Sequence, residues 1–219
     1  MRQSGMSVLA GFFILILFCS LSYAQSQQVT NGLNFLFSTQ NPDGSWNGTL
    51  LRGPFSTTVN VIETLSVLGQ GNTSAYSNAV SWLQAQDLET TEQLSDRIYV
   101  LSTAGTDRDL LISYIESITG AWGGYEDYDI NNLDTSLAVR ALKKINYQDQ
   151  DMMSSAVDYL ISTQNTDGGW GFKQGMDSEV HYTALISKTL QQFPRTTSIA
   201  TAINKATTYL IAHQNTGTP

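Results

Sequence analysis

The sequence predicts an all-α protein made of repeated helical hairpins, and a duplicated loop is the first sign of the repeat. The segment 40–46, QNPDGSW, has a near copy in the segment 164–170, QNTDGGW. Each copy follows a stretch with apolar residues at positions i, i+3 and i+4, such as Leu33, Leu36 and Phe37, which is the spacing of one helix face. Because a single hairpin cannot bury its own apolar face, the copies are expected to stack and share a core.

Each loop is predicted to end the helix before it and to fix the corner between two helices. Glycine adopts a positive φ without steric cost, and an aspartate side chain can accept a hydrogen bond from the backbone that follows it. A tryptophan at each corner buries a large apolar area. We therefore assign structural roles, and no role as catalytic acids, to the following residues of the repeat: Gln40, Asp43, Gly44, Trp46, Gln164, Asp167, Gly168 and Trp170.

A second helix is predicted after each loop, and a threonine marks its start. This threonine lies 12 residues after the loop tryptophan in the first copy and 13 residues after it in two later copies, at Thr58, Thr135 and Thr183. In the hairpin whose loop lacks a tryptophan, the segment 95–105 is expected to supply the second helix. The second helices are rich in Ala, Val, Ile and Leu, so we place them in the inner of two layers.

The chain is expected to consist of an export signal at 1–24 and one repeat domain at 25–219. Arg2, the apolar run 8–21 and the tripeptide SYA have the order of a cleavable signal peptide. The apolar run is shorter than the ~20 residues that span a bilayer, which favours cleavage over a membrane anchor. The predicted hairpins are 28–70, 74–106, 108–147, 151–194 and a partial one at 199–219.

The loop pattern resembles the QW-type repeats of the squalene cyclase and protein prenyltransferase superfamily. The resemblance is fullest at 40–46 and 164–170, partial at 120–125 (GAWGGY), and weak elsewhere. It implies an α/α toroid or open solenoid of about four to five hairpins. The family ring has six, so we expect an incomplete ring, with further chain or domains after Pro219. The resemblance also implies that the loop Gln ties helix ends together beneath the indole.

Composition excludes several functional classes. Cys19 is the only cysteine and lies within the expected signal, so the mature chain would have no disulfide, cysteine nucleophile or thiolate metal site. The net charge of -8 argues against a nucleic-acid partner, and no lysine-rich run indicates a membrane surface once the signal is removed. We expect no cofactor and no metal, and a partner that is a small molecule or another protein.

The enzymatic sites of the resembled families are incomplete in this sequence. The resemblance implies that a cyclase would protonate its substrate from an Asp-x-Asp-Asp motif, and the corresponding segment 131–134 keeps only Asp134. A prenyltransferase zinc site and a thioester-bearing toroid would both need a cysteine, and only two histidines, His181 and His213, are present. A lyase on this scaffold would need a basic residue, for which the candidates are Arg52, Arg97, Arg140 and Lys173.

Two short regions remain as candidates for a binding site: an acidic and aromatic stretch after the third loop, and a His-Tyr pair at the start of an inner helix. The acidic stretch could bind calcium or hold a polar ligand, although the Asp-x-Asp-x-Asp-Gly pattern of calcium loops is missing and a solvated loop is the simpler interpretation. A lone histidine is more often a packing residue than a catalytic base. The pocket candidates are Trp122, Tyr125, Glu126, Asp127, Asp129, Asp134, His181 and Tyr182.

From these observations we expect an exported, non-catalytic toroid domain that binds a small molecule or a protein through its concave inner end. The alternative is an enzyme, either a terpenoid-cyclase-like isomerase or a polysaccharide lyase, whose acid or base lies outside the recognisable motifs.

Overall fold

The computed structural model describes residues 26–48, 53–103, 105–116 and 119–214. Within these ranges the regular elements are helices, apart from one short strand pair and an isolated bridge between Gly123 and Ile130, which confirms the predicted all-α class. The expected signal at 1–24 and the candidate base Arg52 lie outside the described residues. No helix in the described part of the chain is both long enough and apolar enough to cross a membrane.

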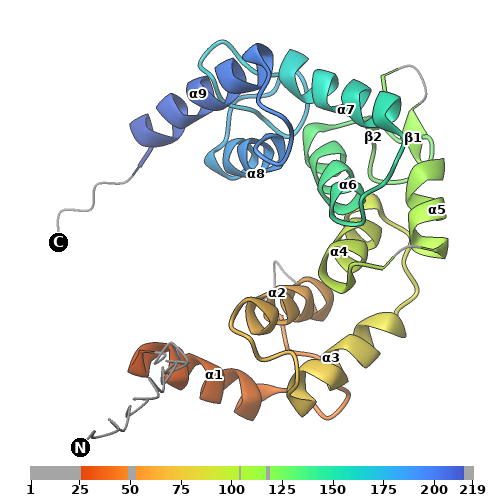
Figure 1. Cartoon of the computed structure of the whole chain (residues 1–219), viewed down its shortest axis with the longest axis vertical. Coiled ribbons are helices and arrows are strands. Elements are labelled where there is room, and N and C mark those ends of the chain that lie inside the picture. The colour runs from red at the N-terminus through yellow and green to blue at the C-terminus, as the bar shows by residue number, and fades with distance from the viewer. Residues whose placement is uncertain (1–25, 49–52, 104, 117–118, 215–219) are drawn as a thin grey trace, which may run out of the picture.

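The helices form two layers along one curved path that is open on one side (Figure 1). Neighbouring inner helices pack against one another in chain order, and outer helices flank them on the convex side. This is the predicted arrangement, with the second helix of each hairpin inside. The outer helices are α1 (Gln27–Thr39), α3 (Ser74–Gln84), α5 (Thr106–Ser113), α7 (Gln150–Ser162) and α9 (Thr197–Ala212), and the inner ones are α2 (Pro54–Val67), α4 (Thr91–Leu101), α6 (Asn132–Lys144) and α8 (Val180–Leu190).

Side-chain caps set where most of these helices begin. In α4, the Thr90 hydroxyl accepts a hydrogen bond from the backbone N–H of Gln93 at 3.1 Å, which satisfies one of the free donors of the first turn. The helix therefore starts at Thr91, four residues before the predicted segment 95–105. In α2, Pro54 takes the first position, where its fixed φ suits the helix and its missing N–H costs nothing.

Each inner helix buries the same four positions, namely one threonine and the residues three, four and seven places after it. In α4 the threonine is Thr91, so the hairpin without a loop tryptophan keeps the buried pattern of the others. This periodicity turns one face of every inner helix toward the outer layer. The four sets are Thr58, Val61, Ile62 and Leu65; Thr91, Leu94, Ser95 and Ile98; Thr135, Ala138, Val139 and Leu142; and Thr183, Ile186, Ser187 and Leu190.

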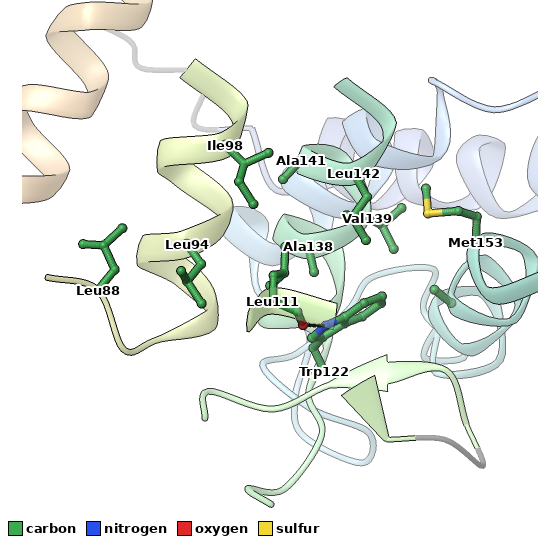
Figure 2. Packing of buried hydrophobic residues seen from close by; sticks show 11 residues of the cluster. Leu88, Leu94, Ile98, Leu111, Trp122, Ala138, Val139, Ala141, Leu142 and Met153 are labelled. Carbon is green, nitrogen blue, oxygen red and sulfur yellow. Dashed lines mark hydrogen bonds between the residues drawn. The ribbon is translucent and has the colours of Figure 1, made fainter. Parts of the chain in front are cut away.

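Among the described residues, the buried side chains form three clusters along the arc, joined by two shared aromatic residues. The middle cluster draws on α4, α5, α6 and α7 and closes over the indole of Trp122 (Figure 2). Phe55 also contacts the cluster of α1 to α3, and Phe193 also contacts the cluster of α7 to α9. The core is therefore a chain of linked units, as expected for stacked repeats.

A small antiparallel strand pair lies at the third loop and was not predicted. β1 (Ile115–Glu116) pairs with β2 (Ala121–Trp122), with Ile115 opposite Trp122. Two-residue strands are too short to show the alternating pattern that identifies a strand in a sequence.

Candidate functional site

The loop tryptophans occupy the corners between outer and inner helices, as the repeat predicts. Trp170 is fully buried, and its Nε1 donates to the carbonyl oxygen of Leu160 in α7 at 2.7 Å. Its backbone N–H donates to Thr183 Oγ1 in α8 at 2.9 Å. The same two bonds recur from Trp46 to Leu36 and Thr58, and from Trp122 to Leu111 and Thr135. The bond from the tryptophan backbone N–H to the threonine hydroxyl explains why the sequence spacing between these two residues is nearly constant.

The loop glutamines tie each corner to the next hairpin. Gln164 Nε2 donates to the carbonyl oxygen of Gly168 in its own loop and to that of Ala202 in α9, both at 2.9 Å. Gln40 makes the equivalent pair of bonds to Gly44 and to Ala75 in α3. One side chain thus satisfies a loop carbonyl and a helix carbonyl from neighbouring units.

The loop aspartates act as turn formers. Asp167 Oδ1 accepts hydrogen bonds from the backbone N–H of Gly169 at 2.9 Å and from Ser178 Oγ at 2.8 Å. Asp43 Oδ1 accepts from the N–H and hydroxyl of Ser45, and the Ser45 hydroxyl bond is the main cause that lowers the pKa of Asp43. A lowered pKa at Asp43 favours its charged form, which is the opposite of what a general acid needs.

Trp122, predicted as a pocket residue, is instead a third corner tryptophan. It is 0% exposed and lies within the core, where its indole is covered by Leu111 and Ala138 (Figure 2). The spacing of 13 residues to Thr135 already indicated this role, although the loop at 120–125 lacks the Gln and Asp of the other copies.

The acidic stretch after the third loop is a solvent-exposed turn. Glu126, Asp127 and Asp129 are exposed, and the rings of Tyr125 and Tyr128 lie 5.2 Å apart beside them. Asp129 forms an exposed ion pair with Lys173 at 3.4 Å. Across the described ranges, no group of three or more His, Cys, Asp or Glu side chains is placed to hold a metal ion.

Asp134 is separated from that stretch and buried at the start of α6. Its backbone N–H donates to Asn131 Oδ1 at 2.8 Å, and the Asn131 amide donates back to Asp134 Oδ2 at 2.6 Å. Burial raises the pKa of Asp134, the charge of Glu92 raises it further, and the bond from Asn131 opposes both. The carboxylate therefore holds the side chain of the residue that caps its own helix.

Asp134 at the start of α6 and Tyr182 at the start of α8 both interact with the charge of Glu92 in α4. Burial raises the pKa of Tyr182, with smaller contributions from the charges of Glu179 and Glu92. His181 is exposed and lies edge-on to Tyr182, with 5.3 Å between the ring centroids. At this end of the inner layer, Glu92 and Glu179 therefore place negative charge near the half-buried Tyr182.

The candidate bases differ in whether a carboxylate of this chain already forms an ion pair with them. Arg97 forms a two-bond ion pair with Asp107 and also donates to the carbonyl oxygens of Leu83 and Gln86, so it links α4 to the outer layer. Lys173 is paired with Asp129. Arg140 has no such partner among the described residues, and its guanidinium stacks on Tyr99, which the sequence did not predict.

The inner helices turn the side opposite their buried threonines toward the inside of the curve, and we call this surface the concave face. It holds charged and amide side chains as well as aliphatic ones, and its cations are confined to α6 and α8. Its residues are Ser56, Asn60, Glu63 and Val67 from α2; Gln93, Asp96 and Val100 from α4; Leu133, Leu137, Arg140 and Lys144 from α6; and His181, Leu185 and Lys188 from α8.

A cavity of about 370 Å³ lies elsewhere, between α7 and the start of α9. Met153, Val157, Phe193 and Ile199 contribute its apolar wall. None of the predicted pocket residues lines it.

Comparison with solved structures identifies the fold. The type II terpene cyclase MstE from Scytonema superposes with a TM-score of 0.71 at 18% identity, covering 88% of this chain and 65% of that one. A protein from Actinoplanes gives 0.68 at 15% identity, covering 85% and 65%. The ent-copalyl diphosphate synthase from Streptomyces platensis gives 0.60 at 15% identity, covering 84% and 39%.

The chain therefore has the α/α-toroid fold of terpenoid cyclases, and it spans less than two thirds of each of these structures. No protein-family model and no curated protein matches the sequence.

Proposed function

We propose that this chain is an exported, non-catalytic binding module that uses the concave face of its toroid to hold a polar ligand. The observation that carries the proposal is the chemistry of that face. A hydrocarbon substrate gains its binding energy from apolar walls, and desolvating charged groups opposes that gain. The concave face carries Glu63, Asp96, Arg140, Lys144 and Lys188, so it favours a ligand with polar groups of its own.

The state of Asp134 supports the non-catalytic part of the proposal. Protonating an alkene requires an acid whose proton faces the substrate. Asp134 is only 6% exposed and is bonded to the side chain that caps its own helix. The neighbouring motif positions hold Asn131, Asn132 and Leu133, so no second carboxylate adjoins it in the motif.

A terpenoid-cyclase-like isomerase is the second candidate, and one observation favours it. Asp134 stands where the resembled motif has its last acid, and burial raises its pKa, which keeps a proton available to higher pH. The fold neighbours include a type II terpene cyclase and an ent-copalyl diphosphate synthase, as those proteins are named.

One assay separates the two candidates. The purified chain is incubated with squalene and with geranylgeranyl diphosphate, and extracts are examined for cyclised products by gas chromatography and mass spectrometry. We expect none. A cyclised product that disappears in Asp134→Asn would overturn the proposal in favour of the isomerase.

The binding half is tested with methyl-labelled protein by nuclear magnetic resonance. Val100, Leu137 and Leu185 report on the concave face, while Ile211 on α9 serves as a distant control. Glutamate, maltotriose and succinate are added in turn as polar probes. We expect at least one to shift the three reporters and to leave Ile211 unchanged, whereas no shift with any probe would contradict polar-ligand binding.

Export is tested separately, by sequencing the amino terminus of the protein recovered from the culture medium. The expected mature chain begins near Gln25. Recovery only of uncleaved chain from the cell pellet would contradict export.

A further inference from the structure

Among the described residues, Arg140 stacks on an aromatic ring and has no carboxylate as ion-pair partner. The guanidinium carbon of Arg140 lies 3.9 Å from the centroid of the Tyr99 ring, within stacking distance. The ammonium of Lys144, one helical turn further along α6, lies 5.6 Å from the same ring. Two cations from one face of α6 thus converge on an aromatic residue of α4.

The described residues supply no acceptor for this guanidinium. Their ion pairs are Arg97 with Asp107, Arg108 with Asp109, and Lys173 with Asp129, so Arg140 and Lys144 take part in none. Moreover, Arg140 Nε is buried without a hydrogen-bond partner in the part of the chain described here. An unpaired buried donor costs free energy, which a bound acceptor would recover.

Helix-dipole compensation explains only part of this arrangement. Lys143 and Lys144 lie in the last turn of α6, where positive charge interacts favourably with the helix end. Arg140 lies one turn earlier, and the dipole does not account for its stacking or its buried Nε. The equivalent position of α8, the next inner helix, is Lys188, which adds a further cation to this half of the concave face.

The geometry points to an oxyanion-binding site on the concave face, centred on Arg140 and Lys144 against Tyr99, that takes the carboxylate or phosphate group of a small molecule. The stacked guanidinium presents a planar fork of donors, which matches the two oxygens of such a group. Stacking also lowers the entropy cost of binding, because the fork is already oriented. This inference rests on the proposed function and names the chemical class of its ligand.

The test monitors the Nε–Hε resonances of the arginines while inorganic phosphate or succinate is added, with sodium chloride at equal ionic strength as reference. The two anions distinguish a phosphate from a carboxylate ligand. We expect either anion to shift the Arg140 signal in a saturable manner and to leave those of Arg97 and Arg108 in place. Binding of both anions would assign the shared oxyanion chemistry.

Variants then separate a built site from general charge. Arg140→Lys keeps the charge but loses the fork, so we expect affinity to fall about tenfold, the equivalent of one lost charge-assisted hydrogen bond. Tyr99→Leu removes the stack and should also weaken binding. Lys205→Gln removes one exposed cation from the outer helix α9 and should leave the affinity unchanged. Melting temperatures are measured for all variants to show that each is folded.

Two outcomes would overturn the inference: anions shift Arg140 no more than sodium chloride does, or Arg140→Lys and Lys205→Gln weaken binding equally. Failure of the proposed function gives a different result. If the terpenoid assay yields a cyclised product and anion binding is intact, the non-catalytic function is contradicted while the oxyanion site is still supported.

Discussion

The loop tryptophans show how a single residue can decide whether a corner forms. Trp170 combines complete burial with hydrogen bonds to an outer and an inner helix, so truncation removes the packing of the indole and leaves the carbonyl oxygen of Leu160 without its donor, while the backbone bond to Thr183 can remain. The repeat made its structural role predictable. The sequence placed Trp122 both in a partial loop match, with the usual spacing to Thr135, and among the pocket candidates, and its complete burial shows that it is a corner residue.

Replacing Trp170 by Ala should lower the free energy of unfolding by about 3–5 kcal/mol. Urea denaturation followed by far-ultraviolet circular dichroism measures the change. Trp82→Ala is the matched control, because Trp82 is only half-buried and lies on the outer helix α3. Equal losses in the two variants would contradict a special role for the corner.

Asp134 predicts a pH-dependent stability that differs in sign from that of most carboxylates. Its pKa in the folded chain is raised above the ordinary 3.8 by burial. The folded state therefore binds the proton more tightly than the unfolded state, and the unfolding free energy falls as pH rises from about 3.8 through the folded pKa. Above that point the contribution is constant.

Asp134→Asn keeps an oxygen for Asn131 and removes the ionisation. The variant should therefore be more stable than the parent chain above the folded pKa, and the difference should shrink as pH falls toward 3.8. Melting temperatures between pH 3.5 and 7.5 test this. Asp43→Asn should instead be less stable than the parent chain across this range, because hydrogen bonds from Ser45 lower the pKa of Asp43 and its contribution is lost only below pH 3.8. A pH-independent gap for Asp134→Asn would contradict the assignment.

The helices were the most predictable elements, because their apolar period extends over three or more turns and caps mark their ends. The start of α4 was misplaced for a physical reason. Its corner has no tryptophan, so nothing in the sequence pointed to Thr91, whose hydroxyl instead donates to the carbonyl oxygen of Gly123 in the third loop at 2.5 Å. That bond joins residues of two hairpins, and a pattern within one hairpin cannot reveal it.

Two glycines in the loop between α7 and α8 are required for different reasons: one for its positive φ alone, the other also for a close contact with α9. Gly168 has φ of +89° and a Cβ there would lie 2.6 Å from the Lys205 carbonyl oxygen, whereas Gly175 has φ of +82° and open space around it. Gly175→Ala should cost about 1–2 kcal/mol for the left-handed backbone alone. Gly168→Ala should cost clearly more, since α9 must also move. Urea denaturation compares them, and equal costs would show that the contact with α9 relaxes freely.

Across the whole molecule, the sequence predicted the architecture better than the site. Repetition made the two-layer curve predictable, since each hairpin repeats the same helical pattern. The pairing of Arg140 with Tyr99 was not predictable, because the two residues come from different hairpins and belong to no motif. The predicted pocket set also mixed three environments: the core for Trp122, a helix cap for Asp134, and exposed surface for Glu126 and its neighbours.

Because the core is a chain of linked clusters, we expect a destabilising substitution to loosen mainly the helices of its own cluster. The cluster of α1 to α3 shares Phe55 with the middle cluster, and the cluster of α7 to α9 shares Phe193 with it, but no described residue belongs to both end clusters. Trp46→Ala, measured by hydrogen exchange and mass spectrometry, should speed amide exchange strongly in α1, α2 and α3 and leave α8 and α9 unchanged.

Trp170→Ala provides the mirror experiment, with faster exchange in α7, α8 and α9 and little change in α1 and α2. A gradient in each variant would follow from nearest-neighbour coupling, because an opened hairpin removes support only from the units beside it. A uniform increase along the chain would instead mean that the arc unfolds as one cooperative body. Packing between neighbouring inner helices would then couple the stability of all hairpins, and each corner would not stabilise its own hairpin independently.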